Sequence, residues 1–189
     1  MDKTPVQVCQ IKVTLQGSRP PIWRRFQVPG SITLYRLHRV LQVVMGWTDS
    51  HLHQFIVGEI YYRVPDPDDI PAESFEVRDE RRVRLRDVVL GTPAKFVYEY
   101  DFGDCWRHDV LVEGVQEIKA GIQHPVCLAG KRACPPEDCG GIWGYADFLH
   151  AISDPRHPEH GSMKEWIGGA FDPAAFDLEE VNVALRRMR

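Results

Sequence analysis

The chain has 189 residues with a formal net charge of −4, and 43% of its residues are hydrophobic, 26% charged and 10% aromatic. This composition is typical of a soluble globular protein, and the length predicts one domain over residues 1–189. The mild acidity gives no electrostatic basis for long-range attraction to nucleic acid, and no apolar run approaches the ~20 residues of a membrane span, so we expect a cytoplasmic protein with no membrane partner.

The chain begins with a predicted strand hairpin. Residues 6–15 alternate between apolar and polar side chains, but the apolar phase slips between Val8 and Cys9, which predicts a bulge. A GSRPP turn leads into residues 22–28, where alternate apolar side chains share one face. The two runs therefore predict antiparallel strands joined by a short turn.

A helix follows the hairpin. Thr33 stands where an N-cap residue is expected, and Gly46 stands where a helix commonly ends on a glycine with positive φ. Between them, apolar residues recur at helical spacing: Leu34, Leu37, Leu41, Val44 and Met45.

The middle of the chain predicts further strands. HLHQFIV, residues 51–57, alternates as a strand. The acidic, proline-rich segment 65–73 predicts a loop outside the core, and a short helix is expected near residues 84–90. KFVYEY and WRHDVLVEGV flank a DFGD turn, which predicts a second hairpin over residues 95–115.

The C-terminal part predicts a rigid loop and three short helices. The loop contains CPPEDCGG, whose adjacent prolines fit neither a helix nor a sheet interior. Helices are expected at about 144–152 and 162–167, and a third begins at Asp177, which forms a capping-box pattern with Glu180.

Strands precede helices without regular alternation, so we predict an α+β fold. We expect a mixed or antiparallel sheet of about five or six strands, with helices packed on one face and a helical C-terminal end. The Cys-rich loop and the C-terminal helices should close one end of this sheet.

Three segments resemble the plasmid pRiA4b ORF-3-like family: IWRRFQVPGSITLYRLHRVLQVVMGWTDSHLHQF, YEYDFGDCWRHDVLVE and CLAGKRACPPEDCGGIWGYADFLHAISDPRHPEH. EWIGGAFDPAAFDLEEVN resembles the ending of the family. The resemblance implies a compact α+β fold and an association with plasmids and transposable elements. It implies no catalytic residues.

The Cys-rich loop is a candidate zinc site. Cys134 and Cys139 are spaced as C-x4-C, at the wide edge of common zinc-ligand spacing, and His108 could complete the set. Cys127, His157 and His160 are further donors that the sequence offers. The alternative is that the cysteines are buried thiols that pack the loop.

Other polar residues are candidates for a pocket. His51 and His53 are two residues apart on a strand, about 7 Å, which suits chelation of a metal. Phe55 and Val57 share that face, so core histidines with backbone or carboxylate partners are the favoured interpretation. Asp101, Asp104 and His108 surround the DFGD turn and could act as an acid–base set. Their alternative role is turn chemistry.

Two carboxylates complete the candidate set. Glu137 and Asp138 follow the adjacent prolines of the Cys-rich loop. They could serve as acid–base groups, because polar loop residues are often functional. Capping of the next helix is their alternative role.

We therefore predict a binding or interaction module of a mobile element, with a polar pocket between the DFGD hairpin and the CPPEDCGG loop. The first alternative is a metal-assisted hydrolase, in which Cys134, Cys139 and His108 hold zinc and Glu137 or Asp138 activates water. The second is a nucleic-acid-binding accessory protein that uses the arginines at positions 24, 25, 36 and 39. The sequence identifies no other partner.

Overall fold

The structure is a computed structural model that describes residues 6–65, 76–89, 91, 93–118 and 124–188. Most of the proline-rich segment predicted to form a loop at 65–73 lies outside the described residues. No helix among the described ranges is long and apolar enough to cross a membrane.

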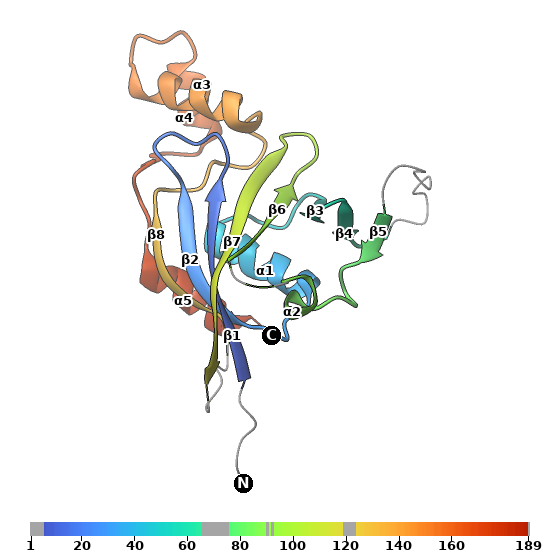
Figure 1. Ribbon diagram of the computed structural model, residues 1–189. Coiled ribbons are helices and arrows are strands. Elements are labelled where there is room, and N and C mark those ends of the chain that lie inside the picture. The colour runs from blue at the N-terminus through green and yellow to red at the C-terminus, as the bar shows by residue number, and fades with distance from the viewer. Residues whose placement is uncertain (1–5, 66–75, 90, 92, 119–123, 189) are drawn as a thin grey trace.

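Within the described ranges, an eight-stranded mixed sheet forms the body of the protein (Figure 1). Its spatial order is β5-β4-β3-β6-β7-β1-β2-β8, and all neighbours are antiparallel except β4 and β5. The strands are β1 (Val6–Leu15), β2 (Trp23–Pro29), β3 (His53–Val57), β4 (Ile60–Arg63), β5 (Glu76–Asp79), β6 (Ala94–Tyr100), β7 (Trp106–Ile118) and β8 (Val126–Lys131).

The overall class is α+β, but the expected five or six strands were wrong. Strands β4 and β5 have four residues each, too few for an alternating pattern to be recognised. The sequence predicts that the rigid Cys-rich loop starts at Val126, but residues 126–131 form strand β8. These three segments form strands because they pair with neighbouring strands, and their own sequence patterns do not predict this.

Both expected hairpins are present. Strands β1 and β2 pair antiparallel, as do β6 and β7 around the DFGD turn. The predicted bulge in β1 lies slightly later than expected, because the register against β7 shifts between Gln10 and Ile11.

The structure contains five helices among the described residues: α1 (Leu34–Met45), α2 (Leu85–Val88), α3 (Gly141–Ser153), α4 (His160–Trp166) and α5 (Leu178–Arg187). The predicted caps of α1 are confirmed, since the Thr33 side chain accepts a hydrogen bond from the Arg36 amide and Gly46 has a φ of 104°. The Asp177 side chain likewise accepts hydrogen bonds from the amides of Glu179 and Glu180 at the start of α5.

The core lies between the sheet and α1. Leu37 and Leu41 of α1 are fully buried with Phe26, Phe55 and Tyr98 of the sheet. Helices α3 and α4 pair with each other at one end of the sheet (Figure 1). Helix α5 instead packs against β8 and α1, so only part of the helical C-terminal region closes that end.

Candidate functional site

Three segments that are distant in sequence meet beside the DFGD turn. The Asp104 carboxylate accepts a hydrogen bond of 3.0 Å from the Gly140 amide, which joins this turn to the CPPEDCGG loop. The Asp101 amide donates to the Leu52 carbonyl at 2.8 Å, which joins the turn to the segment before β3. Asp101 also shapes the turn, because its carboxylate accepts from the Gly103 amide at 2.9 Å.

His51 lies among carboxylates from these segments. Its Nε2 atom is 3.2 Å from Asp138 Oδ1 and 3.9 Å from Glu137 Oε2, and its Nδ1 atom is 3.7 Å from Asp101 Oδ2. Donor atoms that bind one ion at about 2.0–2.2 Å lie about 3–4 Å apart. Within the described ranges, His51, Asp101 and Asp138 are the group of three donors that lie within 4.8 Å of one another. We call these three residues the His51 cluster.

The Glu137 carboxylate is held firmly beside the His51 cluster. Its Oε1 atom accepts hydrogen bonds from the Thr48 amide at 2.8 Å, the Thr48 hydroxyl at 2.9 Å and the Tyr100 hydroxyl at 3.1 Å. Burial raises the pKa of Tyr100, and the neighbouring Glu137 carboxylate raises it further. The Tyr100 hydroxyl therefore stays protonated and can donate to Glu137.

Two buried polar atoms at this site have no hydrogen-bond partner among the described residues: Glu137 Oε2 and His51 Nε2. The 3.2 Å approach of His51 Nε2 to Asp138 is an ion-pair distance without hydrogen-bond geometry. Buried polar atoms in folded proteins are nearly always paired with protein, water or an ion. This donor set, one imidazole with carboxylates, is therefore suited to a bound cation.

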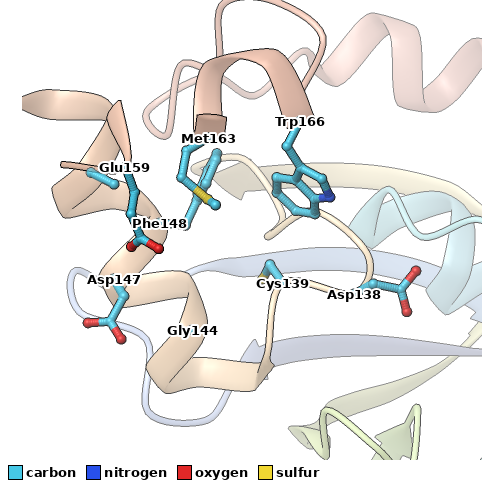
Figure 2. A pocket seen from close by; sticks show the side chains of 9 residues that line it. Asp138, Cys139, Gly144, Asp147, Phe148, Glu159, Met163 and Trp166 are labelled. Atoms are coloured by element: carbon cyan, nitrogen blue, oxygen red, sulfur yellow. The ribbon is translucent and has the colours of Figure 1, made fainter. Parts of the chain in front are cut away.

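A cavity of about 300 Å³ lies beside the cluster, between the CPPEDCGG loop and helices α3 and α4. In Figure 2 the indole of Trp166 lies near Cys139, and the Asp138 carboxylate points away from the cavity. Asp147 and Glu159 add two carboxylates to its wall. The cavity thus shares Asp138 with the His51 cluster.

A second cavity, of about 430 Å³, shares His51 with the cluster. One wall is formed by the rings of His38 and His53, which stack with centroids 3.4 Å apart. His53 Nε2 lies 3.0 Å from both oxygens of the fully buried Glu80 carboxylate. His53 therefore faces this cavity but does not belong to the His51 cluster.

His108 lies in the core, away from the His51 cluster. Its side chain is fully buried, with its ring against Trp47 and Tyr98, and its Nδ1 atom is 3.3 Å from the Tyr98 carbonyl oxygen. Burial lowers the pKa of His108 to about 4. Strand alternation places it on the same face as the buried Trp106 and Val110.

The thiols proposed for zinc are not gathered with His108. Across the described ranges, Cys134, Cys139 and His108 do not form a group of donors within reach of one ion. Burial raises the pKa of Cys134 strongly and that of Cys139 to about 12. Both side chains pack against the hydrophobic core instead.

The four arginines at positions 24, 25, 36 and 39 do not form one surface patch. Arg24 is 2% exposed, and its guanidinium donates to backbone carbonyls, including those of Val44 and Lys131. Arg25 forms a bidentate pair with Glu113 at 2.8 and 2.9 Å. Arg24 cannot contact a phosphate from this position.

Sequence reasoning missed two groups that hold Glu137. Tyr100 directly precedes Asp101 in the YDFGD motif, so strand alternation could have placed its hydroxyl near that turn. Thr48 follows α1 and carries no recognisable sequence signal for its contact with Glu137. That contact joins residues 89 positions apart.

Residues 7–180 match the family described as plasmid pRiA4b ORF-3-like protein. The chain is 42% identical over 182 residues to "Uncharacterized protein y4hQ" of Sinorhizobium fredii, covering 94% of this chain and 90% of that protein. It is also similar to the crystal structure of a protein of unknown function, MM3350, from Methanosarcina mazei Go1. That match has a TM-score of 0.81 and 36% identity, and it covers 94% of this chain and 98% of the other.

Proposed function

The chain belongs to the plasmid pRiA4b ORF-3-like family, and we propose that it is a binding protein that holds a divalent cation at the His51 cluster. The proposed site lies between the DFGD turn and the CPPEDCGG loop. The observation that carries the proposal is the convergence of His51, Asp101 and Asp138 within one ion's reach, with the buried Nε2 atom of His51 unpaired among the described residues. Association with a mobile element is proposed from the family's description alone.

The donor set narrows the kind of cation. Imidazole nitrogen suits zinc, iron, nickel and copper, whereas carboxylate oxygen also suits manganese and magnesium. One nitrogen with two carboxylates therefore favours zinc, manganese or iron(II) over calcium. Two carboxylates balance the charge of a divalent ion, and three protein ligands leave coordination positions for water or a bound molecule.

Metal binding can be tested directly. Protein freed of metal by a chelator is titrated with Zn²⁺ and with Mn²⁺, and the affinity is measured by calorimetry. We expect Asp138→Asn and His51→Gln to weaken binding by at least about 10-fold, since loss of even an outer-shell partner typically costs that much. Asp138 is an exposed loop residue, so its substitution should leave the fold intact.

Two controls make the titration decisive. Glu179→Gln removes one exposed carboxylate from α5 and should bind metal like the parent protein. A Cys134→Ala, Cys139→Ala double variant should also retain binding. Equal affinity in all variants would refute the His51 cluster, and loss only in the double variant would point to the thiols.

A second candidate function, metal-assisted hydrolysis, is favoured by the position of Glu137. One carboxylate oxygen is fixed by three hydrogen bonds, while the other is buried, unpaired among the described residues and 3.9 Å from His51 Nε2. A fixed carboxylate beside a cation can take a proton from cation-bound water. This role for Glu137 keeps the hydrolase proposal and replaces the thiol ligands with His51 and the two aspartates.

The hydrolase proposal needs its own experiment. Metal-loaded protein is assayed against p-nitrophenyl esters of phosphate and acetate. We expect the parent protein to turn over an ester, and we expect Glu137→Gln to reduce this turnover by about 100-fold or more, as for loss of a general base. The metal affinity of the Glu137→Gln protein should fall by less than that of the Asp138→Asn protein. Turnover that survives Glu137→Gln, or a metal-loaded protein inactive on every ester, would argue against this second function.

A further inference from the structure

A third cavity lies on a different part of the molecule, between the β1–β2 turn and α3. Its volume is about 480 Å³, and its walls include Arg19, Arg132, Ile142, Trp143 and Tyr145. Neither Asp138 nor His51 lines it. It is therefore separate from the His51 cluster and its two neighbouring cavities. We call this third cavity the groove.

Trp143 is the feature of this groove that most requires explanation. It lies near the start of α3, and 83% of its surface is exposed, the largest fraction among the large hydrophobic residues in the described part of the chain. Most tryptophans are largely buried, because each can remove a large apolar area from water. An indole held in solvent beside a cavity is characteristic of a contact surface.

The groove is positively charged although the protein is acidic overall. Arg19 and Arg132 line it, and no aspartate or glutamate among the described residues does. In the described residues neither guanidinium forms an ion pair, whereas Arg25 and Arg81 are paired with carboxylates. A local excess of unpaired positive charge in a chain of net charge −4 indicates an anionic ligand.

The walls of the groove are held in place by local contacts. Ser18 fixes the β1–β2 turn, because its hydroxyl donates to the Leu15 carbonyl at 2.7 Å and accepts from the Ile22 amide at 3.0 Å. Gly17 has a φ of 75°, and a Cβ there would lie 3.0 Å from Ile142 of α3. The turn and the helix are thus in close contact, which orders the groove before any ligand binds.

We propose that this groove binds single-stranded nucleic acid, with a base stacked on Trp143 and backbone phosphates paired with Arg19 and Arg132. An exposed indole offers a flat face to an unpaired base, and such stacking tolerates any sequence. A duplex hides the faces of its bases, so it cannot use Trp143 in this way. The proposal places nucleic-acid contacts here rather than at the arginines of positions 24–39, and it does not depend on a metal.

The test is a titration of fluorescein-labelled (dT)12 by anisotropy, in chelator and over a series of salt concentrations. We expect Trp143→Ala to weaken binding by about 10-fold, as for loss of one base stack, without changing the dependence of affinity on salt. Arg19→Gln and Arg132→Gln should each lower the slope of log K against log salt by about 0.7, the value for one phosphate contact on a single strand.

Matched controls and competing ligands complete the experiment. Arg36→Gln, on α1, and Trp166→Ala, on α4, should bind (dT)12 like the parent protein. Absence of binding at low salt would overturn the proposal, as would equal weakening by the controls. Binding of a 12-base-pair duplex or of dTMP as tightly as (dT)12 would also overturn it. A parent dimer in light scattering that Trp143→Ala dissociates would assign the groove to a second copy instead.

Discussion

Arg24 shows how a charged residue can serve the core. It extends from β2 beneath the C-terminal end of α1, where it donates to the carbonyls of Val44 and Met45. Helix α1 has no basic residue in its last turn, so Arg24 provides the positive charge that favours this end of the helix dipole. The guanidinium also lies 4.3 Å from the centre of the Phe176 ring.

Replacing Arg24 with methionine should therefore destabilise the fold. The change keeps much of the side-chain volume but leaves several buried carbonyls without a donor, so we expect a loss of about 2–4 kcal/mol in the free energy of unfolding. Urea denaturation monitored by tryptophan fluorescence measures this loss. Arg36→Gln, on the exposed face of α1, should change stability by no more than about 0.5 kcal/mol. A similar small change for Arg24→Met would contradict the bridging role.

Two buried histidines link stability to pH. Burial lowers the pKa of His108 to about 4, and burial together with the charge of His53 lowers that of His38 to about 4. Both values lie below the ordinary value of about 6.5. Between pH 6.5 and 4, these two histidines therefore bind more protons in the unfolded chain than in the folded protein. Their contribution to the free energy of unfolding is fully present above pH 6.5 and is lost as the pH falls through this window.

Substitution of His108 tests this pH dependence. Each such group contributes a slope of up to about 1.4 kcal/mol per pH unit. His108→Gln should reduce the slope of unfolding free energy against pH between 4 and 6.5 by up to that amount, measured by urea denaturation at several pH values. Val110→Ala, a core substitution that keeps both histidines, should lower the whole curve without changing its slope. An unchanged slope in His108→Gln would show that this residue does not titrate as described.

Among the helices and strands, local sequence signals predicted the segments whose structure is determined locally. Thr33, Gly46 and Asp177 cap their helices as expected, because capping depends on residues within one turn. Strands β4, β5 and β8 lacked such signals. Strand β5 is a charged segment, EVRD, that becomes a strand only by pairing with β4.

The candidate site was predictable residue by residue but not as a cluster. The sequence predicts Asp101, Glu137 and Asp138 as polar residues of irregular segments but assigns His51 to a strand. In the structure β3 begins only at His53, and His51 lies beside the three carboxylates. The order of strands β3, β6 and β7 determines whether His51 or His108 lies beside the carboxylates. That order comes from long-range pairing, and it places His51 beside Asp101 and buries His108.

The junction between the DFGD turn and α3 depends on Gly141. Its φ is 68°, and a Cβ there would lie 2.5 Å from the Asp104 carbonyl oxygen. We expect Gly141→Ala to cost about 1–3 kcal/mol of unfolding free energy, because backbone atoms on both sides must move, and to weaken metal binding at the His51 cluster. Chemical denaturation and the metal titration measure the two effects.

Gly161 provides the control for this junction. It lies in α4, where a Cβ would meet no atom within 4 Å, and its φ is not positive. Gly161→Ala should leave stability unchanged or raise it by up to about 1 kcal/mol, because alanine favours a helix. If Gly141→Ala were equally harmless, the close approach of the turn and the loop would not matter for either property.

In the part of the chain that the structure describes, the eight-stranded sheet has two edges, β5 and β8. Exposed edges invite pairing with other chains. Strand β5 is short and carries three charged residues. Strand β8 is covered instead by Asn182 of α5, whose side-chain oxygen accepts from the Cys127 amide and whose nitrogen donates to the Cys127 carbonyl, both at 2.9 Å. At Cys127, one amide side chain thus takes the place of a neighbouring strand.

Asn182→Ala should therefore expose an edge of the sheet. The loss of two hydrogen bonds leaves both backbone groups of Cys127 unpaired, so we expect a cost of about 1–3 kcal/mol in unfolding free energy and increased self-association through β8. Urea denaturation measures the first effect, and light scattering over a range of protein concentrations measures the second. Arg186→Ala, an exposed change on the same helix, should affect neither. Asn182 joins α5 to the sheet at a residue 55 positions away in sequence. If the Asn182→Ala protein stays as stable and monodisperse as the Arg186→Ala protein, α5 does not protect this edge.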